Sequence, residues 1–175
     1  MRARPIIAIL LLLGLAGTAS AQQSSGQNSI LAGHDTGADV FFDADRLELL
    51  DREDRVLLVG NVVARQAGLT LRTSRLRVAY ADTGGIDISR LDASGGVTLT
   101  SASETARGDY AVYDIDDGLI TVVGDVRLQQ GSNELVGERL TIDLDSGRAV
   151  IDGGPRGIDQ SGGRVSGRFT VPERD

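Results

Sequence analysis

The sequence predicts an all-β fold, a stack of bent antiparallel strands that turn one face of each strand toward a shared interior. The first observation is a repeat. A small residue, a polar residue and an Arg or Tyr, followed by alternating apolar residues, recur from positions 44, 73, 108, 137 and 166. Three of the four spacings are 29 residues and one is 35. The second observation is that the apolar residues in every copy lie two apart, which is the period of a strand.

A second recurring element lies between these copies and is centred on a glycine with apolar residues two and four positions away. Its copies are centred on Gly60, Gly95 and Gly124, and a weaker copy is centred on Gly153. By position, each glycine falls on the same face as the flanking apolar residues. A residue without a side chain there allows the strand to bend or another backbone to approach closely. We therefore predict that these four glycines are structural.

The strand segments are separated by clusters of the residues that turns require, Asp, Asn, Ser and Gly. These clusters lie at 51–54, 82–85, 114–118, 131–133 and 143–147. The 35-residue spacing contains six extra residues, which we expect to enlarge a surface loop around residues 82–89. No segment shows a helical period over three turns.

The N-terminus has the layout of a secretory signal peptide, predicted for residues 1–21. Arg2 and Arg4 precede an apolar run over residues 6–15, and the segment ends in small residues up to Ala21. The alternative is a membrane anchor, but this run is shorter than the roughly 20 residues that a spanning helix needs. A bacterial signal without a following Cys predicts cleavage near Ala21 and release into the periplasm. Residues 22–38 are rich in Gln, Ser and Gly and predict a flexible leader. His34, the single histidine, is interpreted as solvated.

The composition argues against several function classes. The formal net charge is −7 and aromatic residues make up 3% of the chain, so nucleic acid is not an expected partner. All 18 basic residues are Arg and there is no Cys, which excludes a phosphate-loop lysine, a Schiff-base lysine, a thiolate nucleophile and disulfides. The sequence shows no Ser nucleophile motif, and the carboxylates of Glu53 and Asp54 are interpreted as solvated charges. We predict no enzyme activity and no cofactor.

Two acidic segments, 114–118 and 143–147, are similar to the start of a calcium loop. They lack the full set of oxygen ligands at the spacing that calcium requires, and each lies where the repeat needs a turn. We interpret both as turns and predict no metal site.

The candidate binding site is the apolar inner face taken as a set. Between its members lie mostly charged and small polar residues, as in a sheet with one buried and one wet face. For any one residue, an ordinary core position is as good an interpretation as ligand contact. The candidate residues are Leu47, Leu49, Val56, Leu58, Val62, Leu76, Val78, Val97, Leu99, Tyr113, Ile120, Val122, Val126, Leu128, Leu140 and Ile142.

Over residues 39–151 the chain resembles the OstA-like family of lipopolysaccharide-transport proteins. The resemblance is carried by the segments 42–47, 58–62, 91–97, 120–131 and 137–143. It implies a β-jellyroll that is bent, antiparallel and open at both ends, which we assign to residues 39–172, followed by a tail at 173–175. It also implies that lipid A acyl chains travel in the apolar groove. Copies of the protein would associate head to tail and would bridge an LptC-like subunit to an LptD-like barrel.

The expected function is thus a periplasmic bridge that binds lipopolysaccharide and shields its acyl chains on the way from the inner to the outer membrane. Each buried methylene of an acyl chain contributes about 0.8 kcal/mol, so an aliphatic groove suits this cargo without positive charge. The alternative is a β-repeat module that is not catalytic, whose interior is only a core and which binds a protein partner by edge-strand addition.

Overall fold

The computed structural model describes residues 34–82, 85–154 and 163–170. The predicted signal peptide, residues 22–33 of the leader and the tail lie outside these ranges. The described chain is all-β, as predicted, apart from one turn of 3-10 helix at Asp51–Glu53. Within the described ranges, no helix is long and apolar enough to cross a membrane. The strands are β1 (Phe41–Asp43), β2 (Arg46–Leu50), β3 (Arg55–Gln66), β4 (Leu69–Asp82), β5 (Ile86–Thr100), β6 (Glu104–Asp114), β7 (Leu119–Gln130), β8 (Asn133–Asp143), β9 (Arg148–Asp152) and β10 (Ser166–Arg168).

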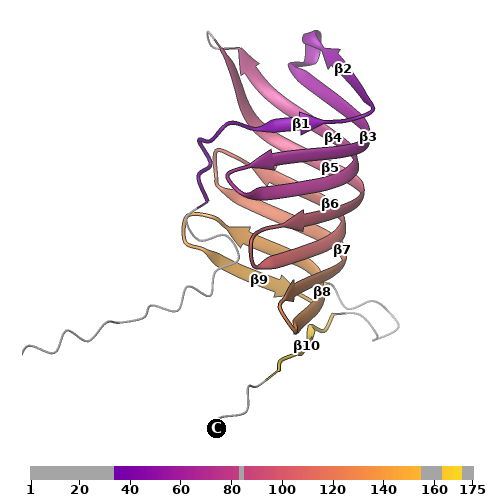
Figure 1. Ribbon diagram of the computed structural model, residues 1–175, viewed down its shortest axis with the longest axis vertical. Helices are drawn as coiled ribbons and strands as arrows, with labels where there is room; N and C mark the ends of the chain where they lie inside the picture. Colours follow the sequence, from indigo (N-terminus) through magenta and orange to yellow (C-terminus); the bar gives the residue numbers. More distant parts are fainter. Residues whose placement is uncertain (1–33, 83–84, 155–162, 171–175) are drawn as a thin grey trace, which may run out of the picture.

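The strands form one antiparallel sheet in which each long strand pairs with its neighbours in the sequence (Figure 1). Strands β3 to β8 form the body of the stack. At one end, the short strands β1 and β2 both pair with β3, and at the other end β9 and β10 both pair with β8. This arrangement follows from the repeat, because tight turns join strands of similar length into successive hairpins.

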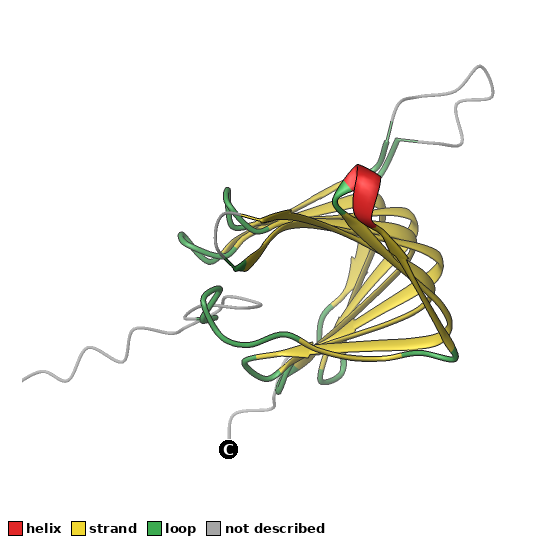
Figure 2. Cartoon of the chain, turned by 90° about the horizontal axis from the view of Figure 1, so that it is seen from above, coloured by secondary structure: helices red, strands yellow, loops and turns green. Residues whose placement is uncertain are grey.

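Every ladder between the long strands is interrupted at the same level, and this divides the sheet into two arms. The β2–β9 arm contains β2, β9 and the segments 55–59, 75–82, 86–94, 110–114, 119–123 and 139–143. The β1–β10 arm contains β1, β10 and the segments 62–66, 69–73, 97–100, 104–107, 126–130 and 133–137. Figure 2 shows the sheet bent between the arms into a trough with one open side. The predicted stack of bent antiparallel strands, a jellyroll open at both ends, is confirmed.

The bend contains Gly60, Gly95 and Gly124, which the sequence predicted to be structural, and all three have a left-handed conformation. Their φ angles are +81°, +83° and +84°. The residue that follows each one also has a positive φ, so each pair forms a bulge opposite one residue of the next strand. Left-handed backbone is strained for residues with a Cβ, which explains why the repeat requires glycine here.

The prediction that these glycines face the interior is wrong. A Cβ on Gly60 would meet the carboxylate of Asp45, and one on Gly124 would meet the carboxylate of Asp109. Both aspartates are exposed and are the polar residue of the first motif. The two motifs therefore meet at the corner, where the polar residue of one strand lies over the glycine of the next.

At the fourth copy, the corner glycine is Gly154 and not Gly153. Gly154 has a φ of +76°, and a Cβ there would meet the side chain of Glu138. Gly153 has another structural role, because a Cβ at this position would collide with the backbone of Gly163 and Arg164. The prediction is thus displaced by one residue.

The six extra residues of the long spacing do not enlarge a loop, contrary to our expectation. They lengthen β4 and β5 to 14 and 15 residues, the longest strands described. The paired extension reaches Asp82 opposite Ile86, with an irregularity in the register between Ala79 and Tyr80. In the β2–β9 arm, β4 and β5 therefore reach further than the other strands.

The two acidic segments form turns, as interpreted. Asp114 accepts a hydrogen bond from the backbone N–H of Asp117 at 3.3 Å, and Asp143 accepts one from that of Ser146 at 2.9 Å. The hydrogen bonds from the backbone and side chain of Ser146 hold the pKa of Asp143 below its usual range, because they stabilise its charged form.

Candidate functional site

The structure places most of the predicted inner-face residues in one continuous core between the two arms. Val56 and Tyr113 are half-buried and pack against this core. Leu47 and Leu49 are both 59% exposed. The remaining candidates are buried: Leu58, Val62, Leu76, Val78, Val97, Leu99, Ile120, Val122, Val126, Leu128, Leu140 and Ile142.

Leu47 and Leu49 are exposed because they lie on the last strand at one end of the stack. In the register of β2 on β3, Leu47 lies opposite the buried Leu58 and Leu49 opposite Val56. Directly paired residues share a face of an antiparallel sheet, so both leucines belong to the inner face. The apolar interior therefore continues to this end of the molecule without a cover among the described residues.

A small cavity lies between the arms where they approach the open side of the trough. Its volume is about 40 Å³. Its walls are almost entirely apolar and come from both arms, with Ala64, Leu69, Leu71 and Leu99 on one side and Leu91, Ala93, Ala111 and Ile120 on the other. Pockets for small molecules are usually about 300–1,000 Å³, so this cavity is too small for a ligand of that size in this conformation. No backbone pair among the described strands joins a residue of one arm to a residue of the other, and between the corners the arms meet through side-chain packing.

The segment that precedes β1 lies across this open side, and we name residues 34–40 the strap (Figure 2). The side-chain amide of Gln66, a residue only 7% exposed, donates to the backbone carbonyls of Thr36 and Ala38 at 2.9 Å each. Its carbonyl oxygen lies 3.2 Å from Nε2 of His34. Val40 contributes to the wall of the cavity. The leader was predicted to be flexible over 22–38 and His34 to be solvated; in the structure Gln66 contacts residues 34, 36 and 38, and His34 is half-buried.

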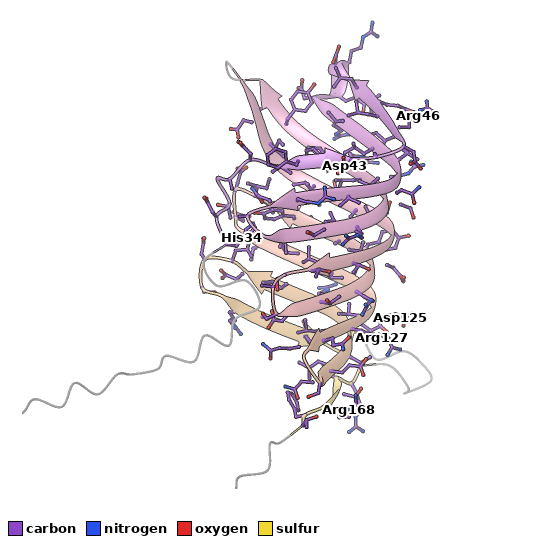
Figure 3. All side chains as sticks on the ribbon, in the orientation of Figure 1. His34, Asp43, Arg46, Asp125, Arg127 and Arg168 are labelled. Atoms are coloured by element: carbon purple, nitrogen blue, oxygen red, sulfur yellow. The ribbon has the colours of Figure 1, made fainter. Side chains whose placement is uncertain are left out.

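The strap lies opposite the corners of the trough. In Figure 3, His34 is on one side of the stack, and Asp125, which follows a corner glycine, is on the other. A ligand that entered the interior between the arms would therefore meet the strap first.

Three buried side-chain oxygens have no hydrogen-bond partner among the described residues: Oγ of Ser101, in the turn between β5 and β6, and two that line cavities of the interior. The first of these two is the hydroxyl of Tyr113, which lines the cavity between the arms. Burial, and to a lesser extent the negative charge of Asp145, raise the pKa of Tyr113 to about 12. The hydroxyl thus stays neutral near pH 7, where it can donate a hydrogen bond to a ligand.

The second group is Oε2 of Glu104 on β6, which lines a pocket that extends toward the end formed by β9 and β10. Glu104 is 6% exposed, and the pocket has a volume of about 190 Å³. Burial raises the pKa of this carboxyl, and a hydrogen bond from Gln130 partly opposes the shift. Sequence reasoning missed Glu104 and Gln66, although both lie at inner positions by the period of two, because a polar residue there resembles a solvated face.

The outer face carries charges in exposed ion pairs. Arg65 contacts Asp43 at 2.6 Å, and Arg90 contacts Asp92 at 3.0 Å. Exposed ion pairs of this kind contribute about 0–1 kcal/mol each to the free energy of unfolding. In the part of the chain that the structure describes, no three acidic or histidine side chains converge as a metal site would need. What the arrangement offers chemically is an aliphatic surface enclosed by a polar exterior.

The fold and its interior together define the class of protein: an open-ended β-jellyroll whose apolar inner face runs from one end to the other. Residues 42–148 match the family described as LptA/(LptD N-terminal domain) LPS transport protein. The chain therefore belongs to this family of lipopolysaccharide-transport proteins, as the resemblance of the sequence indicated.

The chain is also similar to individual proteins in sequence and in structure. A protein of Rhizobium meliloti (strain 1021), described as uncharacterised, is 30% identical over 162 residues, which are 87% of this chain and 83% of the relative. The crystal structure of LptH, the LptA homologous periplasmic component of the lipopolysaccharide transport device of Pseudomonas aeruginosa, superposes with a TM-score of 0.67 at 16% identity. It covers 79% of this chain and 99% of LptH. At this identity the likeness shows the fold.

Proposed function

We propose that this protein is a periplasmic bridge in lipopolysaccharide transport, in which the trough shields the acyl chains of lipid A from water. The observation that carries the proposal is the continuity of the aliphatic inner face, from the exposed Leu47 and Leu49 to the pocket beside Leu128. Membership of the transport family supports the cargo. The predicted signal peptide, with cleavage near Ala21, supports the location.

Loading requires the arms to separate, because the cavity of about 40 Å³ is too small for an acyl chain. The absence of backbone pairs between the facing arms of the described strands supports this motion. The left-handed corner residues are the hinge points at which the arms can spread. The apolar surface exposed by spreading is then covered by the acyl chains, at about 25 cal/mol per Å².

We also propose that copies associate head to tail and meet LptC-like and LptD-like partners at the two ends. Each end consists of short strands that pair on one side only among the described residues, β1 and β2 at one end and β9 and β10 at the other. Leu47 is exposed at the first end and Phe169 near the second. The two ends differ, so pairing them is heterologous and leads to open chains of molecules.

The test is photo-crosslinking in cells with a matched pair at each level of the trough. A benzoylphenylalanine at the inner positions Leu47, Leu99 or Leu128 should capture lipopolysaccharide. The adjacent outward positions Glu48, Thr98 and Arg127 are the controls, and they should not capture it. Equal capture at Thr98 and Leu99 would contradict the proposal. Leu47 is exposed, so this position remains informative even where the bulky group disturbs a buried site.

The second candidate function is a β-module that binds protein partners by edge-strand addition, with the interior serving only as a core. Among the described strands, β2 and β9 each pair on one side only, and this favours it. The two functions differ in solution. A trough that opens binds an apolar dye, which lipopolysaccharide displaces, whereas a permanently closed core binds neither.

A further inference from the structure

A second pocket lies in the trough beside Glu104, near the end formed by β9 and β10. Its apolar walls are Leu128, Leu135, Ala149 and Phe169, and its polar members are Glu104, Gln130 and Asn133. Leu128 belongs to the core and Leu135 packs against it. The pocket is therefore a continuation of the apolar interior, with a volume of about 190 Å³ against about 40 Å³ for the cavity behind the strap.

The hydrogen bonds of this pocket leave one buried oxygen without a partner. Gln130 donates its amide to Oε1 of Glu104 at 2.6 Å. The side-chain oxygen of Asn133 accepts from the backbone N–H of Thr170 at 2.9 Å. Oε2 of Glu104 is buried and has no partner among the described residues. Leaving a buried carboxylate oxygen unpaired is costly, so the pocket is suited to a ligand that brings a hydrogen-bond donor.

The number of free acceptors selects the chemical class of this donor. Oε2 is the acceptor of the pocket that is buried without a partner, and a hydroxyl supplies one donor to it, whereas an ammonium group brings three. Four of the seven lining residues are apolar, so a ligand whose remainder is hydrocarbon suits the pocket. A hydrocarbon chain with one hydroxyl matches both requirements, whereas a plain acyl chain would leave Oε2 without a hydrogen-bond partner.

We propose that this pocket is a subsite for a hydroxylated acyl chain, in which the chain's hydroxyl donates a hydrogen bond to Oε2 of Glu104. The inference rests on the proposed function, because it assigns a chemical feature to the acyl chains that the trough shelters. Gln130 positions the carboxylate by holding Oε1, and Leu128, Leu135 and Phe169 contact the methylenes. The subsite thereby distinguishes hydroxyacyl chains from ordinary fatty acyl chains of equal length.

The experiment compares two neutral probes that differ by one hydroxyl, methyl 3-hydroxytetradecanoate and methyl tetradecanoate, as competitors of an apolar fluorescent dye on the purified mature protein. We expect the hydroxy ester to bind about tenfold more tightly, the value of one hydrogen bond to a charged acceptor. Glu104→Leu should abolish this preference while it leaves the plain ester's affinity unchanged or higher. Glu104→Gln retains an uncharged acceptor and should retain part of the preference. Asp116→Asn, at an exposed turn, removes the same charge and should behave as wild type.

The outcomes separate this inference from the proposed function. Equal affinity of the two esters for wild type, or a preference that survives Glu104→Leu in a folded protein, overturns the hydroxyl subsite alone. Failure of both esters to bind overturns acyl-chain binding and the subsite with it. Tetradecylamine binding more tightly than the hydroxy ester, in a manner that depends on Glu104, overturns the subsite in favour of a cation site. Far-UV circular dichroism of each variant confirms that it is folded.

Discussion

Gln66 donates a hydrogen bond to the backbone carbonyl of Ala38 at 2.9 Å, and this contact joins the strap to the rim of the trough. The same amide also donates to the carbonyl of Thr36, so one buried side chain holds both Thr36 and Ala38 in a turn that lies outside the repeat. The strap has no ladder of its own at this point. Gln66 is consequently the main polar contact that keeps the open side covered.

Gln66→Leu should release the strap. Both carbonyls lose their buried donor, and we expect the free energy of unfolding to fall by about 1–2 kcal/mol. Amide hydrogen exchange of residues 36–40 should become faster, and the apolar dye should bind more tightly because the entrance is uncovered. Gln129→Leu, on the exposed outer face of β7, is the control. Unchanged exchange in the strap of the Gln66 variant would show that other contacts hold it.

The contact at the corner can be tested by comparing two glycines that have nearly the same φ angle, one at a corner and one at a turn. Gly124 has a φ of +84° beneath Asp109, and Gly68 has a φ of +85° with nothing within 4 Å of a built Cβ. Gly68→Ala should cost about 1 kcal/mol for left-handed backbone alone. Gly124→Ala should cost at least about 1 kcal/mol more, because its Cβ also collides with Asp109.

Asp109→Gly should recover the additional cost when it is combined with Gly124→Ala, and urea denaturation of the four variants gives the coupling directly. If the two alanine variants prove equally stable, Asp109 moves aside at no cost, and its contact with Gly124 is not the reason for glycine at this corner.

The sequence predicted what depends on periodicity and missed what depends on single contacts. Leu58, Val62 and Leu140 follow from the period of two and are all buried. Ala93 and Ala106 are equally buried, but alanine is too common on exposed faces to be a signal. The corner copy at Gly153 was displaced because Gly154 follows it directly and only the contact with Glu138 decides between them.

The site shows the same division. The aliphatic inner face could be predicted as a set, whereas Gln66 and Glu104 could not, because their partners are brought to them by the fold. The alternation of Ile86 and Ile88 is a strand signal that would have corrected the expected loop, since both residues extend β5. The strap could not be found, because its residues show no period and owe their position to a residue about 30 positions away.

The titration of Glu104 should make the free energy of unfolding depend on pH. Burial raises its pKa above the ordinary value of 4.5, so the folded state binds this proton more tightly than the unfolded chain does. Between these two pKa values the folded state holds more protons, and stability therefore falls as the pH rises through this window. Glu104→Gln removes the titration. Its stability relative to wild type should increase from about pH 4 to about pH 7 in urea denaturation, because only the wild type loses stability across the raised pKa.

Asp116→Asn, at an exposed turn, supplies the comparison and should run parallel to wild type over this range. A Glu104→Gln variant that follows wild type at every pH would mean that the carboxyl is solvated in the folded protein.

The exposed end of the interior makes the last prediction. Leu47 is 59% exposed although it lies opposite the buried Leu58, so this leucine contributes little to the isolated molecule. Leu47→Asp should change the free energy of unfolding by no more than about 0.5 kcal/mol. If the ends of two copies continue one apolar face, the same substitution places a charge in their interface, and the concentration-dependent association seen in sedimentation velocity should disappear. Thr98→Asp puts an equal charge on the outer face at mid-stack and should leave association intact. Association that persists in Leu47→Asp would mean that copies meet elsewhere, and that the apolar face ends at β2.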